Sequence, residues 1–195
     1  MFSSPNINEN LLISVYRDSR TVFRLKDIAL LTGATNFQSL NSKLNYYVRT
    51  GRILNPHKGI YAKRGYNPEE LSCRVYSPSY ISLEYVLQKS GVIFQYDPGI
   101  TVISYLSRSI DIDDLSLRFR KVKGEILVNS AGIHQAKNHI NIASTERAFL
   151  DLMYLDPGYY IDNPGPLDKK EIKRLLGVYD NRSLNSRINE MMYNA

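Results

Sequence analysis

The segment Asn36–Arg49, with the sequence NFQSLNSKLNYYVR, decides how the first third of the chain folds. Spacing its residues about 100° apart around a helix axis separates two faces. One arc carries the apolar residues Phe37, Leu40, Leu44, Tyr47 and Val48. The opposite arc carries the polar and basic residues Gln38, Ser39, Ser42, Lys43, Tyr46 and Arg49. The segment therefore predicts a helix that buries one face in a core and leaves a polar, basic face outside.

Two shorter helices are predicted before this segment. Ile7–Tyr16 has apolar residues at helical spacing, and Leu25–Thr32 does the same over a shorter length. Gly33 stands where a helix-ending glycine is expected. Thr21–Phe23 predicts a short extended link between the two helices, and Ala34-Thr35 predicts a tight turn before Asn36.

A hairpin is predicted directly after the third helix. Arg52–Asn55 and Ile60–Lys63 have the composition of short strands, and Pro56–Gly59 between them is rich in turn residues. Three helices followed by a hairpin are typical of a winged helix-turn-helix domain, in which the hairpin is the wing. We expect this domain to occupy residues 1–65.

The positive charge of the chain lies almost entirely in this predicted domain. Residues 1–65 contain ten Lys and Arg residues and three acids, a net charge of +7, whereas residues 66–195 have a net charge of −1. No Asp or Glu occurs between Asp27 and Glu69. Such a surface suits the phosphates and base edges of DNA. A three-helix domain with a solvated basic face that contacts another protein is the alternative interpretation.

The predicted DNA contacts come from the turn before the third helix, the polar face of that helix, and the wing. Gln can bond adenine, Lys and Arg can bond guanine or phosphate, and Ser can bond either. The candidate residues are Thr35, Gln38, Ser39, Ser42, Lys43, Tyr46, Arg49, Arg52, His57, Lys58, Lys63 and Arg64.

Residues 66–195 predict a second domain of mixed α/β structure with a small antiparallel sheet, so that the fold class of the whole chain is α+β. The expected helices are 80–90, 145–155, 168–176 and 183–192. The expected strands are 101–106, 115–121 and 125–128, with the last two paired as a hairpin.

The second domain contains no recognisable catalytic or metal-binding motif. Asp111, Asp113 and Asp114 are a clustered set of carboxylates that could hold a cation, but a turn between two strands is the favoured interpretation. The Arg118/Arg120 pair indicates either a second positive surface or an ordinary solvated strand face. We therefore expect no enzyme activity, no metal and no cofactor.

The remaining composition excludes several protein classes. Cys73 is the only cysteine, which rules out an internal disulfide and a Cys-rich zinc site. No apolar stretch approaches the roughly 18 residues of a membrane span. The first six residues lack the basic and apolar regions of a signal peptide, so we expect none. We expect a cytoplasmic protein.

Three segments together resemble the AbiEi family of bacterial antitoxins from type IV abortive-infection toxin–antitoxin systems. The first runs from Arg49 through the hairpin residues Lys58-Gly59-Ile60-Tyr61, and the second from Tyr76 to Ile93. The third is Ile142–Leu152, similar to the family's "iA-x-x-EkAllDl" helix. Thr145 stands where a proline is common in the family, and either residue suits a helix start.

The resemblance implies a DNA-binding repressor of its own operon that binds inverted repeats. It also implies a C-terminal domain, residues 66–195, that opposes a toxin of the nucleotidyltransferase type, with no direct contact required. Two other hypotheses remain open. One is a stand-alone regulator whose second domain binds a small molecule in an apolar pocket. The other is a metal-dependent nuclease that uses the three clustered aspartates.

Overall fold

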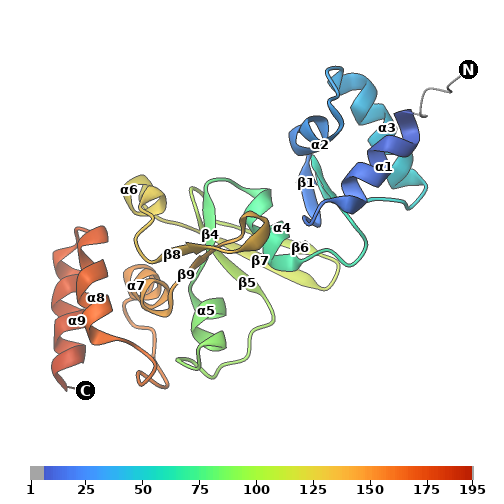
Figure 1. Cartoon of the computed structure of the whole chain (residues 1–195). Coiled ribbons are helices and arrows are strands. Elements are labelled where there is room, and N and C mark those ends of the chain that lie inside the picture. Colours follow the sequence, from blue (N-terminus) through green and yellow to red (C-terminus); the bar gives the residue numbers. More distant parts are fainter. Residues whose placement is uncertain (1–6, 195) are drawn as a thin grey trace, which may run out of the picture. The chain divides into compact units, whose positions relative to one another are not determined.

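The chain folds into two compact units, Met1–Val75 and Tyr76–Ala195. The computed structural model describes residues 7–194, and the side chains of residues 11–191. Unit 1 combines helices with a small antiparallel sheet, and unit 2 combines helices with a larger mixed sheet (Figure 1). The chain therefore has the mixed helix and sheet content that its sequence predicts.

Unit 1 contains the predicted helices and hairpin in the predicted order. Its elements are α1 (Ile7–Arg17), β1 (Val22–Arg24), α2 (Leu25–Thr32), α3 (Phe37–Arg49), β2 (Leu54–His57), β3 (Ile60–Ala62) and α4 (Pro68–Val75). The extended link became β1, because its backbone pairs with β3 in antiparallel register. β2 pairs with the other edge of β3, also antiparallel.

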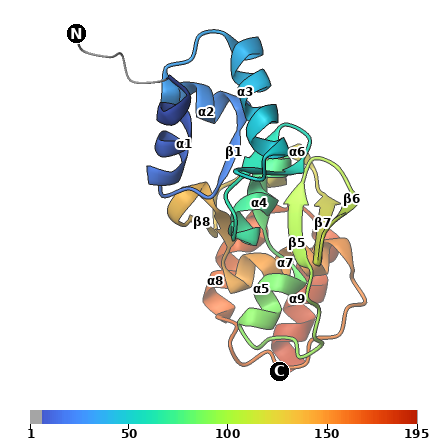
Figure 2. The same cartoon turned by 90° about the vertical axis from the view of Figure 1, so that its right-hand side faces the viewer.

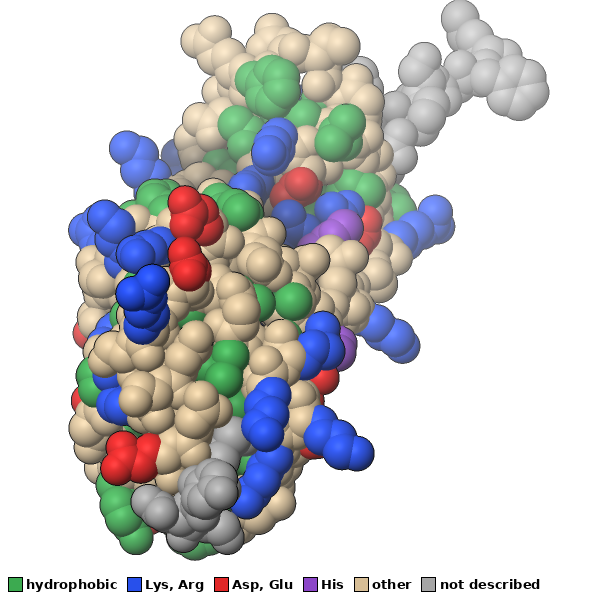
Figure 3. Space-filling model, turned by 90° about the vertical axis from the view of Figure 1, so that its left-hand side faces the viewer, with side chains coloured by type: hydrophobic (Ala, Val, Ile, Leu, Met, Phe, Trp, Pro, Cys, Tyr) green, Lys and Arg blue, Asp and Glu red, His purple; other side chains and the backbone are tan. Residues whose placement is uncertain are grey.

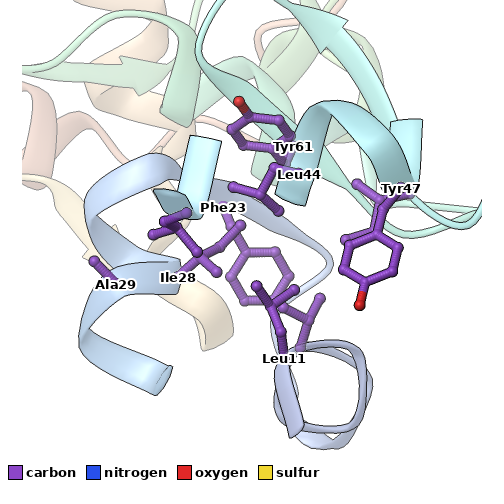
Figure 4. Close-up of a cluster of buried hydrophobic side chains, with 10 residues drawn as sticks. Leu11, Phe23, Ile28, Ala29, Leu44, Tyr47 and Tyr61 are labelled. Carbon is purple, nitrogen blue, oxygen red and sulfur yellow. The ribbon is translucent and has the colours of Figure 1, made fainter. Parts of the chain in front are cut away.

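The core of unit 1 forms where the three helices meet β1 and β3 (Figure 4). Leu40, Leu44 and Tyr47 of α3 are at most 3% exposed. They pack into one buried cluster with Leu11, Val15, Phe23, Ile28, Ala29, Ile53 and Tyr61. Because burying one large apolar side chain contributes about 1.5–3 kcal/mol, these contacts fix the rotation of α3 firmly.

A buried carboxylate ties α4 to β1, and unit 1 therefore extends ten residues beyond the predicted boundary at 65. Glu70 of α4 is 0% exposed. Its two oxygens accept hydrogen bonds from the Thr21 hydroxyl (2.7 Å) and from the backbone N–H groups of Thr21 (2.9 Å) and Val22 (3.1 Å). A buried charge needs such partners, so α4 belongs with the sheet of unit 1.

Unit 2 is built on a six-stranded sheet in the order β6-β7-β5-β4-β9-β8. Its strands are β4 (Ser79–Ile81), β5 (Ile100–Ser104), β6 (Arg108–Ile112), β7 (Leu115–Lys121), β8 (Ile133–Gln135) and β9 (Asn141–Ala143). β5 and β7 are parallel, as are β4 and β9, and the other neighbours are antiparallel. The sheet is thus larger than the small antiparallel one expected, and of mixed direction.

The helices of unit 2 are α5 (Glu84–Lys89), α6 (Gly124–Val128), α7 (Thr145–Leu155), α8 (Lys169–Leu175) and α9 (Arg182–Asn194), with short 3₁₀ turns η1 (Lys137–His139) and η2 (Leu176–Val178). α7 packs against α5, α8 and β9. Figure 2 shows α5, α7, α8 and α9 gathered at the same end of the unit. α7, α8 and α9 confirm the predictions for these segments.

Two predictions for unit 2 were wrong. The expected helix over 80–90 is a strand followed by a shorter helix, because Tyr80 pairs with Ile103 of β5 and Ile81 also pairs with β9. The expected strand over 125–128 is α6. Both edges of β7 are already occupied, by β5 and by β6, so no edge remains for a third partner.

A buried ion pair joins α6, α7 and β4 at the centre of unit 2. Arg147 and Asp151 of α7 are both 0% exposed, and Nε of the arginine lies 3.4 Å from a carboxylate oxygen of the aspartate. Arg147 donates to the carbonyls of Ile126 (2.8 Å) and Ala131 (2.9 Å). Each donor of the arginine thus has a partner that the fold places there.

The carboxylate of Asp151 is held by hydroxyl groups as well. It accepts hydrogen bonds from Ser82 (2.7 Å), Tyr179 (2.7 Å) and Tyr80 (3.2 Å). Burial raises the pKa of Tyr80 and of Tyr179, so both hydroxyls keep their protons and remain donors. Together the contacts fix the second unit around α7.

We expect Arg147→Met to lower the free energy of unfolding by about 3–5 kcal/mol, because it leaves the Asp151 carboxylate buried without its cation. Urea denaturation followed by far-UV circular dichroism measures the change. Arg174→Met is the matched control, since Arg174 pairs with Glu171 on the surface of α8 and its loss should change little. Equal effects of the two substitutions would contradict this role of Arg147.

Candidate nucleic-acid interface

The exposed side of α3 is the most distinctive surface of unit 1. The Asn36 side chain caps the helix by accepting a hydrogen bond from the Ser39 N–H (2.9 Å). Because the apolar side of α3 is buried, its other side faces solvent: Gln38, Ser39, Ser42, Tyr46 and Arg49 are exposed, and Lys43 is half-buried. The structure thus brings the six helix residues predicted for DNA contact onto one open side.

Contacts within the helix orient several of these side chains. The Ser42 hydroxyl donates to the Gln38 carbonyl (3.0 Å). The Arg49 guanidinium lies 5.9 Å from the centre of the Tyr46 ring, and that ring packs edge-on against Tyr47. Arg49 and Tyr46 therefore present a cation and an aromatic ring together at the C-terminal end of the helix.

Two hollows lie along one flank of α3, of about 600 Å³ and 560 Å³. Ser39 and Lys43 line both. The first hollow is also lined by residues of α1 and by the turn that contains Thr35. The second is also lined by Tyr46 and Arg52. Among the described residues that line them there is no Asp or Glu. The flank is thus a trench of mixed polar and apolar lining that contains the cations Lys43 and Arg52 and lies beside the exposed ridge of the helix.

The hairpin between β2 and β3 is tight and braced. The Asn55 amide donates to the carbonyls of His57 (3.0 Å) and Ile60 (2.6 Å), which closes the turn. Gly59 has φ of 76°, a left-handed conformation that favours glycine. Lys58 at the tip is exposed, and His57 is half-buried. The hairpin therefore offers one exposed cation, Lys58, at its end.

Two of the predicted cations bond to the protein itself. Lys63 donates to the Asp18 carbonyl (2.5 Å) and lies over the rings of Tyr16 and Phe23. Burial lowers the pKa of its ammonium group. Arg64 donates through Nε and Nη2 to the Gly51 carbonyl, at 3.2 Å and 3.0 Å. Both side chains hold loops of unit 1 in place.

The loop between α1 and β1, which contains Asp18, also contains an ion pair. Arg20 bonds both oxygens of Asp18, at 2.9 Å and 2.8 Å. This bond holds the pKa of Asp18 down at about 2, so its carboxylate stays charged and paired at neutral pH. One of the three acids of residues 1–65 is thereby neutralised locally.

One helix residue lies where the periodicity did not place it. Phe37 was predicted to face the core with Leu40 and Leu44, but it is 51% exposed. The core ends one turn further along α3, at Leu40. Asn41 and Asn45 of the same helix are also exposed. None of these three uncharged residues was among the predicted DNA contacts, which were chosen from the polar and basic arc of the helix.

Unit 2 carries a separate, apolar pocket of about 240 Å³. Phe149 of α7, Ile172 of α8 and Ile188 of α9 form its walls, and Tyr160 and Leu167 come from the loop between α7 and α8. Lys169 is the charged residue among the described side chains that line it. The neighbouring helix α8 also carries Lys170, Lys173 and Arg174, and Figure 3 shows Lys and Arg side chains at several places on one face of the molecule.

The charged residues of unit 2 that the sequence pointed to lie in a turn and on a strand. Asp113 and Asp114 form the two-residue turn that joins β6 to β7, and Asp113 has φ of 52°. Among residues 11–191 no three His, Cys, Asp or Glu side chains lie close enough to hold a metal ion together. Arg118 pairs with Asp97, and Arg120 is half-buried.

Comparison with known proteins places the chain in no family. No family model matches it, and a comparison with curated proteins found no match. Within the described residues, every helix is too short or too polar to cross a membrane.

We expect Lys63→Met to lower the stability of unit 1 by about 1–2 kcal/mol, because the Asp18 carbonyl loses its donor. Lys43→Met should change stability by less than about 0.5 kcal/mol, since Lys43 lines an open trench. Thermal melts of the two variants beside the parent protein measure the difference. If both substitutions destabilise equally, Lys63 is not the structural contact that its bonds indicate.

Proposed function

We propose that this chain is a DNA-binding transcriptional autorepressor and the antitoxin of a type IV toxin–antitoxin system. Unit 1 is then a winged helix, with α3 as the recognition helix and the β2–β3 hairpin as the wing. The order α1-β1-α2-α3-β2-β3 and the sheet order β1-β3-β2 support this assignment.

One observation carries the DNA-binding half of the proposal: α3 exposes a polar and basic side, free of acids, next to a trench that contains Lys43 and Arg52. A recognition helix lies in the major groove while neighbouring cations contact the phosphates. Gln38 and Ser42 would then face base edges. Lys43, Arg49, Arg52 and Lys58 would follow the sugar–phosphate backbone on either side.

Repression follows from occupancy of the promoter. One copy of α3 covers only a few base pairs, so two copies on an inverted repeat supply the specificity that an operator requires. RNA polymerase and the repressor then compete for the same DNA. This part of the proposal needs no ligand or cofactor.

The antitoxin half of the proposal rests on the three segments that resemble AbiEi proteins. Its functional partner is a nucleotidyltransferase-like toxin in the cytoplasm, and unit 2 opposes that toxin. Ser144, Arg147 and Asp151 of the third segment cap and brace α7, so we assign them an architectural role and assign the protein no catalytic residue.

The apolar pocket of unit 2 favours a second candidate function, a stand-alone regulator with a ligand-sensing C-terminal unit. The pocket is lined mainly by aromatic and aliphatic side chains, with Lys169 as the charged group, a composition typical of small-molecule sites. In this case a bound ligand changes DNA affinity, and no toxin is involved.

We expect the triple variant Gln38→Ala/Lys43→Ala/Arg49→Ala to lose specific binding to the upstream promoter fragment of its own gene in a gel-shift assay. Lys43→Ala or Arg49→Ala alone should weaken binding to all sequences and lower the slope of log K against log salt by about one unit each. Gln38→Ala should instead relax base preference, by about 1–3 kcal/mol.

The matched control removes the same charge elsewhere. Lys170→Ala/Lys173→Ala deletes two exposed cations of α8 in unit 2 and should leave promoter affinity unchanged. Full promoter affinity in the folded triple variant would show that α3 is not the recognition helix.

The antitoxin assignment predicts a nucleotidyltransferase-like toxin encoded beside this chain. Expression of that toxin alone should arrest growth, and co-expression of this chain should restore it. The triple variant should neutralise the toxin as well as the parent does, because its substitutions lie in unit 1 and leave unit 2 unaltered. Colony counts under separate induction measure both effects. Growth arrest that persists with the parent chain would refute the antitoxin assignment and leave the DNA-binding assignment intact.

A further inference from the structure

The exposed phenyl ring of Phe37 needs an explanation. Phe37 is the first residue of α3 and is 51% exposed. It belongs neither to the buried cluster of unit 1 nor to the partly buried side chains that pack against that cluster, as far as the described residues show. The buried cluster of unit 1 therefore forms without the Phe37 ring.

The geometry of α3 explains how the ring comes to be exposed. Asn41 lies one turn after Phe37 on the same flank, and its side-chain oxygen accepts a hydrogen bond from the Tyr61 hydroxyl of β3 (2.9 Å). This contact marks where the flank meets the sheet. Phe37 lies one turn before it, beyond the last core residue Leu40, so the first turn of α3 projects out of the core.

The inference rests on the proposed function, in which α3 is a recognition helix. In that case the position of Phe37 predicts a contact with DNA. The N-terminal residues of such a helix contact base edges in the major groove. The 5-methyl group of thymine is the apolar group that the major groove presents, and phenylalanine is among the side chains that contact it. The neighbouring residue, Gln38, has the amide that forms two hydrogen bonds with adenine.

We propose that the first turn of α3 selects A·T base pairs, with Phe37 contacting the 5-methyl group of thymine and Gln38 bonding adenine. Both side chains are exposed at the same end of the helix. Phe37 is thus a specificity residue, whereas Lys43 and Arg52 contribute affinity for any sequence. The same ring used as a contact for another protein is the competing explanation, and the experiment separates the two.

The full chain is first used to select binding sites from a pool of random-sequence duplexes. Each thymine of the selected site is then replaced, one at a time, by deoxyuridine, which removes the methyl group and nothing else. At the position that Phe37 contacts, we expect binding to weaken about fourfold, equivalent to about 0.8 kcal/mol for one buried methyl-sized group. Thymines outside the first-turn contact serve as controls.

Variants at position 37 complete the test. Phe37→Ala should bind thymine and deoxyuridine duplexes equally, because the ring that senses the methyl group is gone. Phe37→Leu should keep part of the discrimination, since leucine is apolar but smaller. Both variants should fold normally, because residue 37 lies outside the core, and circular dichroism checks this.

The outcomes separate the inference from the proposed function. A selected site without A·T pairs, or a parent protein indifferent to every deoxyuridine substitution, overturns the role of Phe37 and leaves DNA binding standing. Unchanged binding of thymine and deoxyuridine duplexes by Phe37→Ala, with the parent also indifferent, is the result expected if the ring contacts another protein instead. Failure to select any sequence overturns both the proposed function and this inference.

Discussion

Three buried side chains of α3 determine what the rest of unit 1 can do. Leu40, Leu44 and Tyr47 fall four and three residues apart and enter the same core, so the helix cannot rotate without exposing them. Since each contributes on the order of 2 kcal/mol through burial, a rotation that turned Gln38 or Arg49 inward would cost several times that amount. The side chains on the opposite side of α3 therefore stay exposed to solvent.

Among the side chains that the structure describes, each unit contains a buried acid whose bonds connect distant segments. Glu70 links α4 to the start of β1 in unit 1, and Asp151 with Arg147 links α7 to β4 and α6 in unit 2. Buried ion pairs contribute little net stability compared with apolar packing. Such buried acids instead favour the native arrangement of the segments they join, because any other arrangement would leave a buried charge without a partner. The helix that resembles the AbiEi motif is accordingly explained by capping and bracing, which agrees with a protein whose function lies in its surfaces.

Local patterns predicted the parts of the fold that local physics determines. Helical periodicity and capping residues located α1, α2, α3 and α7 to within about two residues. The segments 80–90 and 125–128 were misassigned because their state depends on pairing with distant strands: β4 needs β5 and β9, and α6 is a helix because β7 has no edge left. Phe37 was misplaced because periodicity gives the direction of a side chain, not the point at which the core ends.

The sequence predicted the net charge of residues 1–65, but not which of their cations bond to the protein itself and which remain available to a partner. Among the ten cations of residues 1–65, Arg20, Arg24, Lys63 and Arg64 bond to acids or carbonyls of unit 1, a distinction that no sequence pattern carries. Lys43, Arg49, Arg52 and Lys58 lie around the proposed DNA-binding surface, which gives one copy about four cationic side chains for phosphate contacts. The other two cations, Arg17 and Lys26, are exposed on α1 and α2. With each phosphate contact contributing about 0.9 to the salt slope, the proposed interface would give one copy only weak affinity for DNA at physiological salt. Under the proposed function, two copies on a repeated site would therefore supply the affinity that one copy lacks.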